Sequence, residues 1–374
     1  MRAGDRSGSV RFAAALLLLA ACGGDPDEPA STGSHAADAA PATDADVSES
    51  DAALDAGAMD ASASDAVAPD AAAPDAAPYE PPAVELPDPE SDEPFFLSAT
   101  GLYTDVEGKI LAPDLRPFEP AHKLWSDGAD KQRWMRLPRG TKIDSADMDH
   151  WQFPVGAMFW KEFGKEGKRF ETRLVARTGE GPNDYWMGAF AWLEDESDAR
   201  FVPMGEKNVR GSDHDVPTVK NCFTCHNGEP GRVLGFSAVQ QRAVPAMLLT
   251  VPAPAYAVPG EAEVQRALGY LHANCAHCHN PNGSARPDTD MNLRLAIADE
   301  RPEDTTIYRS TIGVDLQYFE SDPLVKRVVA GNPEESGLLF RMAERGKKTQ
   351  MPPLATEVTD PDGLAAVRAW IEGL

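Results

Sequence analysis

The amino-acid sequence predicts a multidomain protein in which a disordered tether precedes an N-terminal β-rich, sandwich-like domain and then an all-α domain. Three observations predict this order. Alanine, aspartate and proline dominate residues 22–93, strand patterns fill residues 94–220, and helix patterns fill residues 260–374. A connecting segment, residues 221–259, carries a cysteine motif of its own.

Residues 1–21 have the features of a bacterial export signal. A basic start precedes an apolar run at residues 12–19, which is too short to span a bilayer permanently. The run ends in Leu-Ala-Ala-Cys, which resembles a lipobox, so we expect cleavage before Cys22 and acylation of its thiol. A plain signal peptide is the alternative. Because Gly23 follows the cysteine, we expect a lipid anchor in the outer membrane, facing the periplasm or the cell surface.

The tether at residues 22–93 has no lysine or arginine and 19 acidic residues, which account for most of the formal net charge of −25. Such a segment cannot bury enough apolar surface to offset its chain entropy, so we expect it to be disordered. No basic stripe follows it in the sequence, which argues against a nucleic-acid partner.

Two strands are predicted most clearly in the β-rich domain, residues 94–220. Residues 170–177 alternate, which places Phe170, Thr172 and Leu174 on one face. Residues 185–192 are apolar on both faces, as expected for a central strand. Six of the seven tryptophans fall in this part of the chain, and we expect them to fill a sandwich core.

Four of the five cysteines belong to two copies of one motif. Each copy reads Cys-x-x-Cys-His, the pattern that attaches a c-type haem through two thioethers. The histidine that follows the second cysteine would bind the iron, because neutral imidazole is a good iron ligand. The sequence therefore predicts two covalently bound haem c groups, held by Cys222, Cys225 and His226 and by Cys275, Cys278 and His279.

Two alternatives use the same cysteines without haem. Two thiolates from each motif would form a four-thiolate zinc site, and each pair alone would form a redox-active dithiol. Two complete motifs, an export signal and the absence of any other internal cysteine favour haem over both.

Residues 260–374 predict helices on either side of the second motif. Val264, Leu268 and Leu271 have helical spacing ahead of Cys275, and Asp360 and Pro361 have the sequence of a helix start. Between the predicted helices, residues 348–354 form a loop that its prolines keep from being helical.

This arrangement of helix, haem motif, Met-Pro loop and last helix resembles the class I cytochrome c fold. The resemblance implies that the loop methionine, Met351, is the axial ligand opposite His279. The alternative for Met351 is a loop methionine that packs on another part of the protein.

Residues 94–374 also resemble bacterial di-haem c-type cytochromes, many of them lipoproteins, in stretches such as 124–129, 151–156 and 271–279. That resemblance implies haem binding and electron transfer with an unidentified redox partner protein. A weaker likeness, to β-sheet cytochromes of the c′-beta kind, is carried by residues 153–156, Lys161 and Cys222.

The sixth ligand of the first haem is not assigned by any comparable loop. His214, His150, Met204 and Met247 are candidates, and an open position is the alternative. With both haems six-coordinate the protein is an electron carrier, and no catalytic acid–base pair is identified. With an open position it is a haem enzyme or gas-binding protein acting on peroxide or a nitrogen oxide. A third possibility makes the β-rich domain a docking or carbohydrate-binding module.

Overall fold

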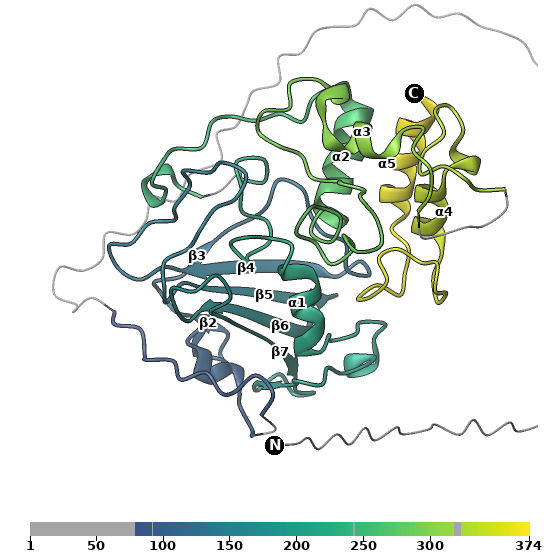
Figure 1. Ribbon diagram of the computed structural model, residues 1–374. Coiled ribbons are helices and arrows are strands. Elements are labelled where there is room, and N and C mark those ends of the chain that lie inside the picture. The colour runs from purple at the N-terminus through teal and green to yellow at the C-terminus, as the bar shows by residue number, and fades with distance from the viewer. Residues whose placement is uncertain (1–78, 92, 242–243, 318–322) are drawn as a thin grey trace, which may run out of the picture. The chain divides into compact units, whose positions relative to one another are not determined.

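This computed structural model describes residues 79–91, 93–241, 244–317 and 323–374 (Figure 1). All of them belong to one of two units of the chain, residues 73–374. The predicted signal, Cys22 and residues 23–78 and 92 of the predicted tether lie outside the described residues.

A six-stranded antiparallel sheet forms the centre of the β-rich part (Figure 1). Its strands follow chain order, so each pairs with its sequence neighbour. They are β3 (Arg116–Pro117), β4 (Asp130–Arg136), β5 (Met158–Lys165), β6 (Lys168–Arg177), β7 (Tyr185–Trp192) and β8 (Ala199–Phe201). A separate two-stranded sheet contains β1 (Tyr103–Asp105) and β2 (Ile110–Leu111).

The two predicted strands are confirmed as β6 and β7. Every residue of β7 is buried, as its two-sided apolar pattern predicts. In β6, Leu174 joins the expected apolar cluster, but Phe170 packs in a different one, with Ala189 and Val209. A bulge in the pairing of β5 with β6 beside Phe163 shifts the register there, so simple alternation fails for Phe170.

The sheet buries apolar side chains on both faces. Trp160 and Leu174 are opposite each other in the register and pack on one face. Phe159 precedes Trp160 and Val175 follows Leu174, so this pair points to the other face, where it packs with Trp151 and Phe236. Five of the tryptophans from the β-rich region are buried, whereas Trp125 is not.

Five α-helices lie in the described residues: α1 (Val219–His226), α2 (Ala262–Asn274), α3 (Thr306–Thr311), α4 (Gly337–Ala343) and α5 (Pro361–Glu372). Single 3-10 turns occur at Leu97–Thr100, Val209–Gly211, Ala246–Leu248, Pro302–Asp304 and Pro333–Glu335. Helices α2 and α5 confirm the two predicted helices. The Asp360 side chain caps α5 by accepting hydrogen bonds from the backbone of Asp362 and Gly363.

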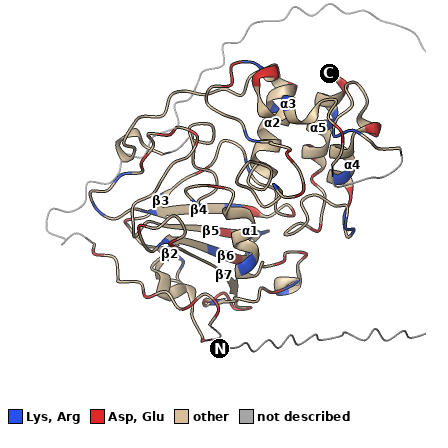
Figure 2. Cartoon of the chain, viewed as in Figure 1, with Lys and Arg blue, Asp and Glu red and all other residues tan. Residues whose placement is uncertain are grey.

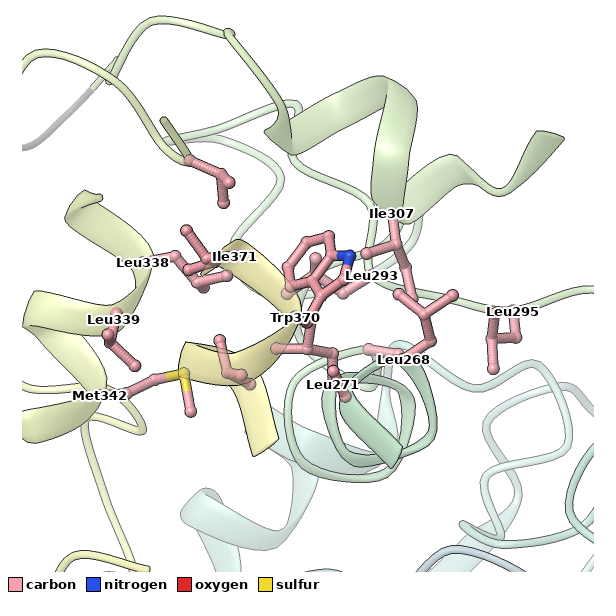
Figure 3. Close-up of a cluster of buried hydrophobic side chains, with 14 of the residues drawn as sticks. Leu268, Leu271, Leu293, Leu295, Ile307, Leu338, Leu339, Met342, Trp370 and Ile371 are labelled. Carbon is pink, nitrogen blue, oxygen red and sulfur yellow. The ribbon is translucent and has the colours of Figure 1, made fainter. Parts of the chain in front are cut away.

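Helices α2, α4 and α5 share one apolar core, which Figure 3 shows around Trp370. Leu268 and Leu271 enter it from α2, and Leu338 and Met342 from α4. The Trp370 indole nitrogen donates to the hydroxyl of Tyr308 in α3 at 3.1 Å, so all four C-terminal helices meet in this core.

The predicted fold class is wrong in two respects. Residues 260–374 do not form an all-α, class I cytochrome c-like domain: their helices are only 6 to 13 residues long. Long irregular segments separate them, and isolated bridges such as Ile312↔Val328 and Lys326↔Ser336 tie those segments together. Periodicity identified two real helices, but it carries no information on the non-periodic chain between them.

The β-rich part is also not a two-layer sandwich in the described residues, because it has one six-stranded sheet and one two-stranded sheet. Apolar strands of this kind fit a single sheet covered on both faces as well as they fit two packed sheets. Among the described residues, no helix has the length and apolar composition needed to cross a membrane.

Candidate functional site

Both cysteine motifs line one cavity of about 460 Å³. That volume lies within the range of ordinary ligand pockets, and most of the cavity wall is apolar. The cavity joins residues from α1, α2, strands β5 and β6 of the sheet and the loop after α4. It contains every site residue predicted from the sequence, namely Cys222, Cys225, His226, Cys275, Cys278, His279 and Met351.

The first motif is presented by α1. Thr218 caps this helix by accepting a hydrogen bond from the backbone of Asn221 at 3.2 Å. Residues three and four apart lie on one helix face, so Cys222, Cys225 and His226 face the cavity together. Figure 1 shows α1 beside the sheet, where it contacts β7.

The imidazole of His226 is oriented by a backbone carbonyl. Its Nδ1 lies 2.6 Å from the carbonyl oxygen of Arg232, so Nδ1 donates and Nε2 is left as the nitrogen with a free lone pair. Burial lowers the pKa of His226 to about 3, which keeps the ring neutral. A neutral imidazole whose other nitrogen donates to a carbonyl is typical of a metal ligand.

The second motif begins where α2 ends. Cys275 is the C-cap residue of α2, and the backbone N–H groups of Cys278 and His279 donate to its carbonyl oxygen at 3.1 and 2.9 Å. His279 is buried, and its Nδ1 has no hydrogen-bond partner among the described residues. Burial lowers the pKa of His279 to about 4, so this imidazole is also neutral.

A side-chain bridge holds the start of the second motif against residues 123–125. The Asn274 carbonyl oxygen accepts from the backbone N–H of Trp125 at 2.7 Å, and its amide nitrogen donates to the carbonyl oxygen of Lys123 at 3.3 Å. The Trp125 indole in turn donates to the carbonyl oxygen of Val358 at 3.0 Å. Trp125 thus lines the cavity instead of filling the sheet core.

The two motifs approach each other closely. The Sγ atoms of Cys225 and Cys278 and a ring nitrogen of His277 lie within 4.8 Å of one another. The interaction between the two side chains raises the pKa of Cys225 and lowers that of Cys278 to about 3. The four thiols of the motifs are free. Cys222 and Cys275 are not part of the three-residue group, so the four thiols do not converge on a single point.

Met351 reaches the same cavity from the loop after α4. Its backbone N–H donates to the carbonyl oxygen of Arg341 at 2.9 Å, which ties the loop to the helix. Met342, from α4, also lines the cavity but is buried in the helical core.

Two basic side chains form part of the sheet wall. Lys161 from β5 and Arg173 from β6 line the cavity, and both lie over the ring of Phe163, at 5.0 and 4.5 Å from its centroid. Arg173 also makes a double hydrogen bond, 2.6 and 2.9 Å long, with the carboxylate of the fully buried Glu171.

The four candidates for the sixth ligand of the first haem do not line the cavity. His214 is buried with its Nε2 2.7 Å from Glu171, and His150 pairs with Glu229 and Arg294. Met204 and Met247 are 78% and 72% exposed. The positions of these four residues in the sequence, relative to Cys222, do not indicate which side chains of the sheet face α1.

The residues present fit a covalently attached macrocycle. Four free thiols, two buried neutral imidazoles and a thioether share a mostly apolar space. The unpartnered Nδ1 of His279 is a buried polar atom that a ligand or an ordered water would satisfy. The four-thiolate zinc site considered from the sequence is not formed, because only Cys225 and Cys278 come together, with His277 as the third member of their group.

Sequence reasoning placed none of Trp125, Tyr270, Arg173 and Arg345 at the predicted site, although all four line the cavity. Alternation could have placed Arg173 on the opposite face from Leu174, but nothing local indicates that this face meets α1. No protein-family model matches the chain, and neither curated proteins nor solved structures gave a match.

Proposed function

We propose that this chain is an extracytoplasmic di-haem c-type cytochrome that binds two haem groups covalently and transfers electrons. The observation that carries the proposal is the single cavity lined by both Cys-x-x-Cys-His motifs and by Met351. Apart from Cys22, the sequence has no further cysteine with which the motif cysteines could form disulfides.

The chain's own residues would attach and orient the two groups. Cys222 and Cys225 would hold the first group and Cys275 and Cys278 the second, through thioethers. His226 Nε2 is available as an iron ligand because Nδ1 is engaged by the Arg232 carbonyl. In the second motif the His279 imidazole is buried and neutral, as an iron ligand would be. Met351 is the candidate for the other protein ligand of that iron.

Bound haem iron supplies one-electron redox chemistry. The protein's contribution is to exclude water and to set the potential through the ligands and the polarity of the site. A thioether ligand and apolar surroundings raise the potential, because they disfavour the extra charge of the ferric state. Because both motifs line one cavity, two bound haems would be near each other and could exchange an electron, which supports electron transfer.

The N-terminal sequence supports export and a lipid anchor on Cys22, both outside the described residues. Haem attachment to this motif takes place outside the cytoplasm, so the export signal and the motifs agree. The partner would be a redox protein, which has not been identified.

The proposal is tested by the mass and absorbance of the purified, exported protein. Two covalently bound macrocycles and a Soret band are expected, and replacing Cys275 by Ala should lower the thioether-bound haem content of the second motif. A chain with no Soret absorbance, or with zinc in place of iron, would contradict it. Cys222→Ala is the matched variant for the first motif.

A second candidate function is supported by the position of the four ligand candidates outside the cavity. An open position on the first iron would let the protein bind a small ligand such as peroxide or a nitrogen oxide, with the second haem supplying electrons. Addition of carbon monoxide to the reduced protein separates the two functions. An unchanged spectrum supports the carrier, and a shift of half of the Soret intensity supports the enzyme.

A further inference from the structure

Three basic residues lie side by side on three strands of the sheet, and two of them, Lys161 and Arg173, line the cavity. Arg133 of β4 is opposite Lys161 of β5, and Lys161 is opposite Arg173 of β6. Directly paired residues in an antiparallel sheet have β-carbons about 5 Å apart on the same face. We call Arg133, Lys161 and Arg173 the cation row; Figure 2 marks the basic and acidic positions of these strands in blue and red.

Like charges in direct cross-strand positions destabilise a sheet unless something offsets their repulsion. On the same face the row has apolar neighbours at one side, Phe159 and Val175. At the other side the register pairs Lys131 with Phe163 and Phe163 with Glu171, so that side contains one basic, one apolar and one acidic residue. Lys131 and the three residues of the row therefore place four basic side chains on this face beside one carboxylate, Glu171, and such an excess of positive charge is a poor arrangement for stability alone.

Carboxylates of the described residues only partly balance the row. Glu171 accepts two hydrogen bonds from Arg173, and its Oε2 is also within hydrogen-bond distance of the His214 ring. Arg133 has the charge of Glu119 near it, but Glu119 also pairs with Lys123 at 2.5 Å. No carboxylate of the described residues forms an ion pair with Lys161.

The part of the row that lines the cavity includes Lys161, which has no ion-pair partner among the described residues. Lys161 and Arg173 line the cavity next to Cys222, and their charges act on that thiol. Burial and the neighbouring cations Arg173 and Arg133 lower the pKa of Lys161 well below its usual value. An anion placed in the cavity would reverse this effect and hold the amine in its charged form.

We propose that Lys161 and Arg173 of the cation row form an anion-binding site of the cavity, in which the Lys161 amine and the Arg173 guanidinium bind a carboxylate or a small oxyanion beside the first motif. The anion has two possible sources: a propionate of the haem itself, or a free anion from solution. The inference rests on the proposed function only for the first source, because a free anion needs only the cavity.

The test uses the purified holoprotein with Lys161→Gln, which removes the charge and leaves an uncharged side chain that does not replace an iron ligand. Lys161→Arg keeps the charge, and Lys165→Gln removes an exposed charge from the same strand. Arg173→Gln is avoided because it would leave Glu171 buried without its partner. The probes are inorganic phosphate and sodium acetate, titrated at constant ionic strength.

If a propionate fills the site, neither probe gives a saturable spectral change. Lys161→Gln then raises the ferric-to-ferrous ratio of one haem about tenfold at a fixed applied potential, equal to 59 mV for one electron. If the site takes a free anion, acetate or phosphate binds saturably to the native protein. Its Kd then rises at least tenfold in Lys161→Gln and stays unchanged in Lys161→Arg and Lys165→Gln.

Two results overturn the anion site while leaving the proposed function intact. One is a haem-loaded Lys161→Gln protein with native potential and native response to both probes. The other is a change of one haem to high spin in Lys161→Gln without any change in anion response, because the amine would then be an iron ligand. If the protein holds no haem, the proposed function fails instead, and calorimetric phosphate binding that is lost in Lys161→Gln still decides the site.

Discussion

Gly228 lies directly against the carbonyl oxygen of His277: a β-carbon at Gly228 would be 2.0 Å from that oxygen. Gly228 follows the first motif by two residues, and His277 is inside the second. The backbones of the two motifs are therefore in contact, and the cavity depends on a residue without a side chain at this point.

Replacing Gly228 by Ala should destabilise the protein by about 1 to 3 kcal/mol, because neither backbone can yield without moving a motif. It should also lower the yield of protein carrying both haems. Chemical denaturation and haem content measure the two effects. Gly373→Ala is the control, since the nearest atom to its β-carbon is 3.5 Å away, and a change there of under about 0.5 kcal/mol is expected.

Met351→Ala should turn one haem high-spin and lower its reduction potential, while both thioether attachments remain. The reason is loss of the only thioether that the loop after α4 brings to the cavity. Absorbance, EPR and a redox titration measure the change. A native spectrum in this variant would remove Met351 from the ligand set.

Met342→Ala is the matched variant for that experiment, since Met342 lines the same cavity but belongs to the helical core. It should cost about 2 to 5 kcal/mol of stability through the space it leaves, with the spin state of both haems preserved. If it gave the spectral change instead, Met342 would be the ligand.

Glu171→Gln should destabilise the protein by about 3 to 5 kcal/mol, because it leaves the Arg173 charge without its buried partner. The pKa of Glu171 is lowered by Arg173 and by the hydrogen bond from His214, against the opposing effect of burial. Thermal and urea unfolding measure the loss. Glu180→Gln is the control, because the Glu180 side chain is 92% exposed; equal effects of the two variants would contradict the role given to Glu171.

Stability should fall as the pH decreases below about 6.5, in part because of His272. Burial lowers the pKa of His272 to about 3, and its Nδ1 accepts a hydrogen bond from the backbone of Leu295 at 3.0 Å. Between about pH 6.5 and 3 the unfolded chain therefore binds a proton at His272 that the folded chain does not bind. The stability that neutral His272 contributes above pH 6.5 is lost as the pH falls through this range.

The contribution of His272 to the slope is at most about 1.4 kcal/mol per pH unit. His272→Gln keeps an acceptor for Leu295 and removes the proton site, so its unfolding free energy should vary less with pH over this range. Urea unfolding at several pH values tests this, and parallel curves for the two proteins would show that His272 does not titrate.

The fold could be predicted from sequence where a local pattern specifies it. The alternation around Leu174 and the cap at Asp360 correctly predicted β6 and α5. The number of sheets, and the irregular chain between α2 and α5, depend on long-range pairing such as Ile312↔Val328 that no short pattern contains. The all-α prediction failed for this reason.

The candidate site also has a part that local sequence patterns predict and a part that depends on long-range contacts. The motif cysteines and histidines follow from spacing alone, and the cavity brings them together with Met351. The partners that complete the wall, such as Arg173 and Trp125, come from distant segments. Their role depends on which sheet face α1 covers, which the sequence does not state.

The shared cavity has a consequence for how two irons would behave. Charges in a largely dry space interact more strongly than in water, so an electron on one centre would make the other harder to reduce. The pair would then titrate with two apparent midpoints that belong to the cavity as a whole and to neither motif alone. Such anticooperativity would let the protein hold one electron over a broad range of solution potential.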